Sequence, residues 1–141
     1  MNEIKFEINQ KDLQRLINKL DASVKDETLR DGLSRARAYI TKWIVENRMR
    51  GPRPDILGVV TGRLSNSVMG SITSPISKQG NTYIAPIGTN VIYARVHEYG
   101  YLKRNIPARP YLRPGIESRG NQLQAVKDIK DVIAAAIARA R

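Results

Sequence analysis

The chain has no cysteine and a single histidine, His97, among its 141 residues. The lack of cysteine excludes disulfide bonds, thiolate metal ligands and a thiol nucleophile. A metal site would have to rely almost wholly on carboxylates, and the seven in residues 31–141 show no recognisable ligand spacing. We therefore expect no metal, no cofactor and no secreted disulfide scaffold.

Long apolar runs are absent as well. No window approaches the roughly 18 consecutive apolar residues of a membrane-spanning helix. The N-terminal stretch MNEIKFEINQKD holds neither an apolar run nor a small-residue cleavage site. We expect a soluble protein without a targeting segment and without a membrane partner.

Aromatic residues are few, at 6% of the chain with one Trp and one Phe, so the core must come mostly from Ile, Leu, Val and Ala. A length of 141 residues suits one domain spanning 1–141. Because such a core is thin, burial against other copies in an oligomer is an expected source of further stability.

Charge of one sign is concentrated in one part of the chain. Residues 1–30 hold six basic and six acidic side chains, so the whole net charge of +11 lies in residues 31–141. A field polarised in this way attracts polyanions, nucleic acid above all, although an ordinary solvated surface is an equally simple interpretation.

The first half of the sequence predicts a strand and two helices. Residues 4–8 alternate apolar and polar side chains, which is typical of a short, half-buried strand. Asn9 is a candidate cap for a short helix reaching Leu20. A longer helix is predicted from about Lys25 to Arg48, followed by an exposed loop with two prolines. Arg35 and Arg37 lie off its apolar stripe and are expected to face solvent or a partner.

The middle of the sequence predicts a helical turn, a strand pair and a short helix. Thr61 is a candidate cap for a turn that points Leu64 inward. Alternation over residues 69–74 predicts a strand, which the turn sequence KQGN connects to a second strand over 82–88. Asn90 is a candidate cap for a helix that Gly100 would end.

The C-terminal third predicts an extended segment and a helix. Pro107, Pro110 and Pro114 argue against helix and for an extended rod or an edge strand. From about Glu117 to Arg141 the apolar spacing is helical again. The predicted fold class is α+β, with a small antiparallel sheet packed by a long helix of the N-terminal half and by a C-terminal helix.

Catalytic motifs are missing. His97 and Glu98 are adjacent on a predicted helix and point about 100° apart, so they do not form a dyad. TGRLSNS lacks the Gly-Lys-Ser/Thr ending of a phosphate loop, and no serine lies in a nucleophile elbow. We expect no catalytic site, and His97 is explained more simply as a hydrogen-bonded residue at a helix end.

Residues 93–117, YARVHEYGYLKRNIPARPYLRPGIE, gather basic, tyrosine and proline residues. Tyrosines among the cations could stack on bases, although Tyr93 and Tyr99 also fit helical core packing. No base-reading motif is present, so any DNA contact would be weak and non-specific. Cations that would contact phosphates include Arg95, Lys103, Arg104 and Arg113.

A second interpretation of the same stretch is a stiff arm that docks on another copy. A proline-rich segment is already extended, so docking it costs little ordering entropy, and Tyr111 and Leu112 would supply apolar anchors. A proline-rich edge strand that covers the chain's own sheet explains the pattern equally well. The arm consists of Pro107, Ala108, Arg109, Pro110, Tyr111, Leu112 and Pro114.

Three motifs in order, TGRLSNSV, IGTNVIYARVHEYG and IPARPYLRPGIE, resemble the neck and tail-completion proteins of tailed bacteriophages. These include the small tail-component proteins of lambda-like siphophages and the virion morphogenesis proteins of Mu-like phages. The YLKRN loop departs from the family, in which many relatives carry small residues there. Besides the arm, the positions that carry the resemblance are Thr61, Gly62, Leu64, Tyr93, Ala94, His97, Glu98 and Gly100.

The resemblance implies a non-enzymatic virion protein at the joint between capsid and tail, working as a ring of six copies. Such a ring would join or complete the tail, surround the DNA channel and contact phage connector and tail proteins. The protein would then be found in the neck or tail of the virion after assembly in the host cytoplasm. The alternative from another class is a free-standing, non-specific double-stranded DNA-binding protein.

Overall fold

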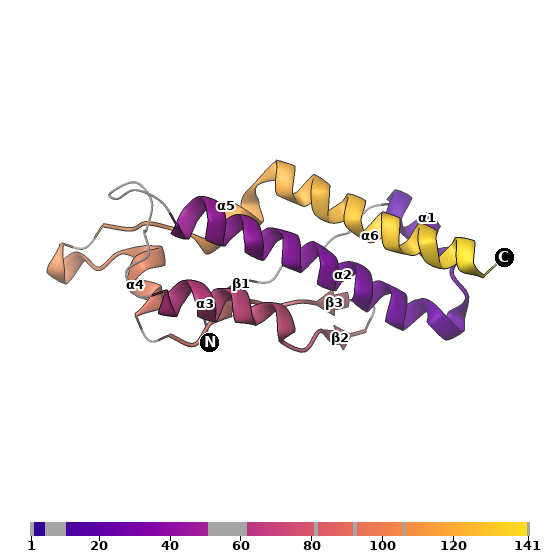
Figure 1. The fold of residues 1–141 in the computed structure, drawn as a ribbon, viewed down its shortest axis with the longest axis horizontal. Helices are drawn as coiled ribbons and strands as arrows, with labels where there is room; N and C mark the ends of the chain where they lie inside the picture. The colour runs from indigo at the N-terminus through magenta and orange to yellow at the C-terminus, as the bar shows by residue number, and fades with distance from the viewer. Residues whose placement is uncertain are drawn as a thin grey trace.

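Two long helices, α2 (Ala22–Ile44) and α6 (Arg119–Arg139), lie side by side and antiparallel in the computed structural model (Figure 1). The structure describes residues 2–4, 11–50, 62–80, 82–91, 93–105 and 107–140. Helix α6 covers one side of α2, and the shorter helix α3 (Arg63–Gly70) lies with the strands on the other side. The molecule is elongated, and the predicted α+β class is confirmed.

Helix α2 begins where its sequence supplies a cap. The Asp21 carboxylate accepts a hydrogen bond from the Ser23 amide at 2.9 Å, so the helix starts three residues before the predicted Lys25. Apolar residues three and four apart then form the buried face that packs on α6. The helix continues as a wider turn, η1 (Val45–Met49), in which the side chains at both ends are buried.

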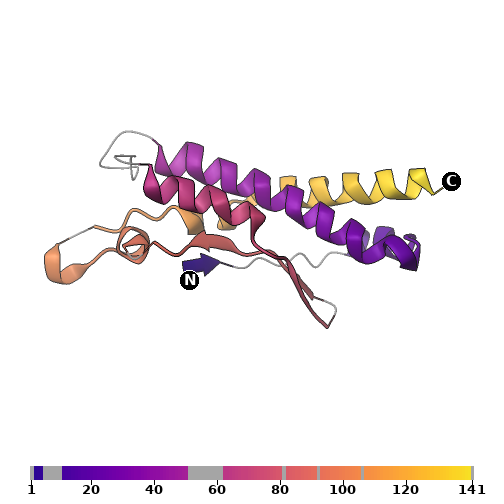
Figure 2. The ribbon, with the colours of Figure 1, turned by 60° about the horizontal axis from the view of Figure 1, so that its bottom comes forward.

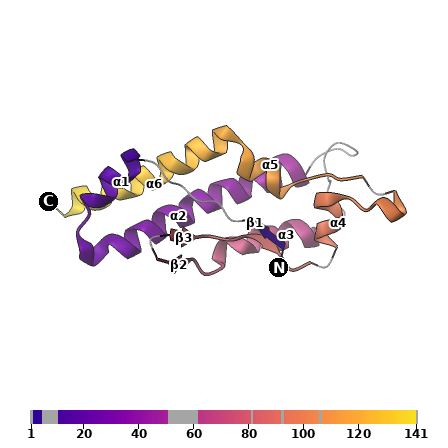
Figure 3. The same ribbon diagram turned by 180° about the vertical axis from the view of Figure 1, so that it is seen from behind.

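Helix α6 follows the same logic. The Ser118 hydroxyl accepts from the Asn121 amide at 3.3 Å and begins the helix. The buried stripe Ala125, Ile129, Ile133 and Ala136 meets α2 along its length. Helix α1 (Lys11–Asn18) packs on α6 near the C-terminal end, as the reverse view shows (Figure 3). This helix and the two long ones confirm the predicted helical regions within the described residues.

The strands are shorter than expected and form two separate pairs in the described part of the chain. Strand β1 (Asn2–Ile4) runs antiparallel to β4 (Ile87–Thr89), with Asn2 opposite Thr89. Strands β2 (Ser77–Gln79) and β3 (Thr82–Ile84) form a hairpin that projects from the body (Figure 2). The predicted KQGN turn falls at this hairpin, but Lys78 and Gln79 belong to β2, Gly80 has φ 61°, and Asn81 lies outside the described residues. Residues 5–8 of the predicted first strand lie outside the described residues.

The strand predicted over residues 69–74 is wrong. Helix α3 extends to Gly70 and continues as a tighter turn, η2 (Ser71–Thr73). The alternation of small and apolar residues in this segment is also typical of a strand. The segment is helical instead, and serine and threonine hydroxyls in it donate to backbone carbonyls of the preceding turn. Ser71 donates to the Val68 carbonyl at 2.6 Å, and Thr73 donates to the Gly70 carbonyl at 2.9 Å.

Arg35 is exposed as predicted, but the prediction for Arg37 is wrong. Arg37 is only 2% exposed and its guanidinium donates to the backbone carbonyls of Ile72 at 2.8 Å and Pro86 at 3.3 Å. Burial lowers the pKa of this guanidinium. The side chain joins α2 to η2 and to the segment before β4, which a periodicity argument cannot detect.

The β2–β3 hairpin is fastened to α2 by one polar cluster. The Tyr83 hydroxyl donates to Asp26 at 2.7 Å, and Arg30 donates to the other oxygen of the same carboxylate at 2.9 Å. Lys78 lies 5.4 Å from the Tyr83 ring centroid. Burial and the hydrogen bond to Asp26 raise the pKa of Tyr83 to about 12, while the same bond and Arg30 lower the pKa of Asp26.

Candidate functional site

The three sequence motifs meet at one end of the molecule. Gly62 precedes α3 with φ 78°, a backbone region that favours glycine, and Leu64 points into the core. Ser67 on α3 shares a 2.6 Å hydrogen bond with the Thr89 hydroxyl, which also accepts from the Val91 amide. The first motif is therefore bonded to the second. Thr61, the predicted cap, lies outside the described residues.

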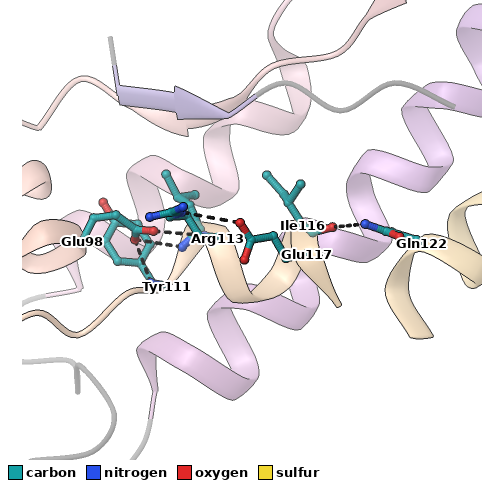
Figure 4. A network of polar contacts seen from close by, with 7 residues as sticks. Glu98, Tyr111, Arg113, Ile116, Glu117 and Gln122 are labelled. Atoms are coloured by element: carbon teal, nitrogen blue, oxygen red, sulfur yellow. Dashed lines mark hydrogen bonds and ion pairs between the residues drawn. The ribbon is translucent and has the colours of Figure 1, made fainter. Parts of the chain in front are cut away.

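Glu98 holds the second motif against the third. Its carboxylate, only 4% exposed, lies on α4 (Ala94–Tyr99) and accepts three backbone amides at the start of α5 (Leu112–Glu117), as Figure 4 shows. Tyr111 and Leu112 donate to one oxygen at 2.8 and 3.1 Å, and Arg113 donates to the other at 3.0 Å. A single acidic side chain thus caps a helix that begins fourteen residues later in the chain.

This arrangement accounts for every amide at the start of α5. The first amides of a helix have no partner within it, and Glu98 takes the three from Tyr111 to Arg113. The next residue, Pro114, has no amide hydrogen to satisfy. The prediction that these prolines exclude helix is therefore wrong for Pro114, which lies in the first turn of α5.

The Tyr111 side chain adds a second link between α4 and α5. It is fully buried, and its hydroxyl donates to the Ala94 carbonyl at 3.2 Å. Burial, helped by the negative charge of Glu98, raises the pKa of the Tyr111 phenol. Two residues earlier in the chain, the Arg109 amide donates to the His97 carbonyl at 2.7 Å. The approach to α5 is therefore bonded to α4 at both Arg109 and Tyr111.

The structure corrects the predicted arm in one respect. Tyr111 and Leu112 are 0% and 2% exposed within this chain, so they do not offer anchors to a neighbouring copy. Residues 107–110 have no regular structure, and Pro107 and Ala108 are exposed, whereas Arg109 and Pro110 are half-buried. Tyr111 and Leu112 therefore pack against the body of their own chain, as the alternative to docking on another copy predicted. They do so at the start of a helix and not in an edge strand.

Helix α4 is shorter than predicted and turns its tyrosines outward. It begins after Tyr93, not at Asn90. Gly100 ends it as predicted, with φ 75° and its amide bonded to the Val96 carbonyl. The interpretation that Tyr93 and Tyr99 pack in the core is wrong, because these side chains are 38% and 57% exposed. The Tyr93 ring meets His97 edge-on with centroids 5.7 Å apart, and the Arg63 guanidinium lies 6.0 Å from the same ring.

Exposed cations and apolar side chains share this end of the molecule. A turn, η3 (Leu102–Arg104), follows α4 and carries Leu102, the most exposed large apolar residue described. The four cations predicted to contact DNA are all exposed, and Arg113 forms an ion pair with Glu117 at 3.6 Å. These four lie on the three consecutive elements α4, η3 and α5: Arg95, Lys103, Arg104 and Arg113.

The groups described at this end include exposed cations and apolar side chains that can contact a partner. No group of three or more His, Asp or Glu side chains among the described residues is arranged to hold a metal ion. The Glu98 carboxylate accepts three backbone amides. Sequence reasoning missed the capping role of Glu98. The available signal was Pro114, since a proline at this position is compatible with a helix start whose amides need an outside acceptor.

Comparison with known proteins identifies the family. A model of the phage virion morphogenesis family matches residues 35–138. The chain belongs to this family. The matched range includes all three motifs, the second half of α2 and nearly all of α6, so the packing and the capped junction described above are features of a virion morphogenesis protein.

One further similarity covers a smaller part of the chain. An uncharacterized protein of Methanocaldococcus jannaschii is 38% identical over 52 residues, which is 37% of this chain and 34% of that protein. The chain thus matches about a third of the length of that relative. No solved structure matches the chain. Within the described residues, no helix of this family member combines the length and apolarity needed to cross a membrane.

Proposed function

We propose that the protein is a structural component of the head–tail junction of a tailed bacteriophage. Copies of the chain form a ring that joins or completes the tail and surrounds the channel through which DNA passes. The ring contacts connector and tail proteins and belongs to the neck or tail of the virion after assembly in the host cytoplasm. Such a part needs no catalytic group and no cofactor.

The observation that carries the proposal is the composition of the end formed by α4, η3 and α5 in a member of a virion morphogenesis family. Three large apolar side chains there, Tyr99, Tyr101 and Leu102, are between 41% and 94% exposed beside unburied cations. Exposed apolar groups of this size in one place are typical of protein contact surfaces. A subunit of a ring requires such surfaces.

The charge distribution favours a DNA channel within that ring. The net charge of +11 lies wholly in residues 31–141, which include the family match. Weak phosphate contacts without base reading permit DNA to slide, whereas base-specific contacts would hold it. The exposed Arg95 of α4 and Arg113 of α5 are suited to such contacts.

Deletion of the gene in its phage, followed by electron microscopy of the lysate, tests the proposal. We expect DNA-filled heads and separate tails that do not join, and a plasmid copy of the gene should restore joined particles. Electron microscopy and sedimentation of the purified full chain should show rings, for which we expect six copies. Joined, infectious particles from the deletion strain would overturn the proposal.

A free-standing, non-specific DNA-binding protein is the second candidate, favoured by the four exposed cations Arg95, Lys103, Arg104 and Arg113. It predicts tight binding to duplex DNA whose logarithmic affinity falls steeply with logarithmic salt concentration. A ring subunit should bind weakly on its own. Replacing all four cations with Gln should mainly reduce DNA affinity under this second candidate and should mainly impair particle assembly under the first.

A further inference from the structure

One group of exposed residues projects from the end of the molecule. We call Tyr99, Tyr101, Leu102, Lys103 and Arg104 the tip. Figures 1 and 3 show this segment, which follows α4, at the end opposite the C-terminus. Leu102 is 94% exposed at its centre.

The tip has a defined backbone. Gly100 and Asn105 flank η3 with φ 75° and 51°. The amides of Arg104 and Asn105 each bond to the carbonyl three residues earlier at 3.2 Å. Glycine tolerates the positive φ at Gly100 and asparagine tolerates the left-handed region at Asn105, so the backbone of the turn is defined on both sides. A preformed surface of this kind loses little entropy when it binds.

The tip also carries charge without a partner in this chain. Neither Lys103 nor Arg104 forms an ion pair with any described residue. Leu102 is an aliphatic side chain with no donor for a phosphate, so DNA would leave the most exposed tip residue unused. A protein surface that combines an apolar residue with carboxylates would use both parts of the tip.

Such a surface is present at the opposite end of this same chain. Val24, Glu27 and Asp31 are exposed and follow one another at three- and four-residue spacing on the first half of α2, so they share one side of the helix. We call these three residues the acidic face, which ends one turn later at Arg35. Neither of its carboxylates forms an ion pair with a described residue.

The neighbouring carboxylate on α2 shows the contrast. Asp26 is held by both Arg30 and Tyr83 within the chain. Glu27 and Asp31 are exposed and form no ion pair among the described residues. The chain therefore carries two cations around an apolar centre at one end and two anions beside an apolar residue at the other.

We infer that the tip of one copy docks on the acidic face of the next copy. The two surfaces lie at opposite ends of the elongated molecule, so one chain cannot bring them together (Figures 1 and 3). A contact between two different surfaces repeats from copy to copy and closes into a ring when the rotation allows. The inference rests on the proposed function in that it assigns a contact for the ring.

Chemical cross-linking tests the contact directly, because the chain has no cysteine of its own. The double variant Val24→Cys, Leu102→Cys is treated with a short thiol-specific bismaleimide and separated under denaturing conditions. We expect a ladder of covalent multimers. The matched control, Val24→Cys with Leu123→Cys, replaces another exposed leucine and should give no ladder.

The two proposals fail in distinguishable ways. A ladder without closed rings by electron microscopy retains the contact and overturns the ring. Rings without a ladder retain the ring and overturn the contact. If neither forms, the inference is overturned, and the gene deletion still tests the role at the junction.

A charge exchange gives a second, independent test. Lys103→Glu with Arg104→Glu makes the tip acidic, and Glu27→Lys with Asp31→Lys makes the acidic face basic. Each variant alone opposes like charges, so its apparent Kd for assembly should rise at least about tenfold. An equimolar mixture offers opposite charges at every contact and should assemble again, with the two variants alternating.

Circular dichroism first establishes that both variants are folded. Lys130→Glu with Arg139→Glu makes the same charge change on α6 and should assemble like the wild type. Failure of the mixture to assemble would overturn the inference. So would unchanged assembly of the tip variant with loss of its DNA affinity, which would identify the tip as a DNA contact.

Discussion

The packing of α2 on α6 and the junction of α4 with α5 hold the molecule by different means. The first contact is apolar and spread along two long helices, with Ala36, Ala125 and Ile133 all at 0% exposure. The second depends on one carboxylate that accepts three amides. Stabilisation that is distributed tolerates most single changes, whereas stabilisation that is concentrated in one side chain does not.

The two regions also have different consequences for binding. Packing of the long helices sets the length of the molecule and keeps its ends apart. The capped junction fixes the direction in which the chain leaves α4 and returns to α5, and the tip lies between these two points. Substitutions at the junction should therefore affect both stability and the position of the tip.

Glu98→Ala tests the junction of α4 with α5, where one side chain carries the contact. Of the changes considered, it should reduce the stability of the fold the most. It leaves three amides at the start of α5 without their acceptor, so we expect a loss of about 3 kcal/mol in the free energy of unfolding. Glu98→Gln keeps one acceptor oxygen in place and should lose roughly half as much. Urea denaturation followed by circular dichroism measures both values.

Glu117→Ala is the matched control for Glu98. Glu117 is an exposed glutamate on α5 that forms a surface ion pair with Arg113, so its loss should cost less than about 1 kcal/mol. Equal losses at Glu98 and Glu117 would show that the capping bonds contribute little and that the junction is held by the burial of Tyr111.

Gly115→Ala tests the close approach of α5 to α2, beside the packing of α2 on α6. A Cβ atom at Gly115 would lie 2.2 Å from Cγ1 and 2.7 Å from Cδ1 of Ile44 on α2, so the helices must shift. We expect a loss of about 2 kcal/mol. In the double variant with Ile44→Ala the clash is absent, and the combined loss should be smaller than the sum of the single losses.

Gly120→Ala provides the comparison. A Cβ there meets nothing closer than the Ser118 hydroxyl at 3.8 Å, and alanine favours the helix, so stability should be unchanged or slightly higher. If both alanine variants behave alike, the close approach of α5 to α2 does not limit the packing.

The packing of α2 on α6 is also the part of the fold that the sequence predicts. Ile40 and Ile44 on α2, like Ile129 and Ile133 on α6, repeat at helical spacing, and local caps such as Ser118 mark where a helix begins. These signals involve neighbours in the chain, so periodicity and capping rules are enough to find them.

The junction of α4 with α5 could not be predicted in the same way. The role of Glu98 depends on amides thirteen to fifteen residues away, and Arg37 is buried because of carbonyls thirty-five and forty-nine residues away. Each of these side chains taken alone suggests a solvated surface. The family motifs placed Glu98 and Tyr111 in the right segments, but only the fold shows that one caps the helix start at the other.

The polar cluster that fastens the β2–β3 hairpin to α2 is a third means of attachment. Its loss is expected to have the smallest effect on stability. Tyr83 donates to Asp26 at the surface, where solvent weakens the pair. The pKa of Tyr83 is raised to about 12 by burial and by this bond, against about 10 in an unfolded chain. The folded state therefore favours the protonated phenol, and the stability that this contributes is complete below pH 10 and is lost as the pH rises from 10 to about 12.

Tyr83→Phe should remove that part of the pH dependence. We expect the urea midpoint of the wild type to fall more between pH 9 and pH 11.5 than that of the variant, and Tyr39→Phe, at another exposed tyrosine, should behave like the wild type. The lowered pKa of Asp26 gives the opposite sign in acid, since its contribution is present above the unfolded value of about 3.9 and is lost as the pH falls through the folded value. Tyr111 also has a raised pKa, but it is common to all three proteins and cancels in the comparison. Parallel midpoints for wild type and Tyr83→Phe in alkali would mean that the hairpin is held by its backbone contacts and not by this hydroxyl.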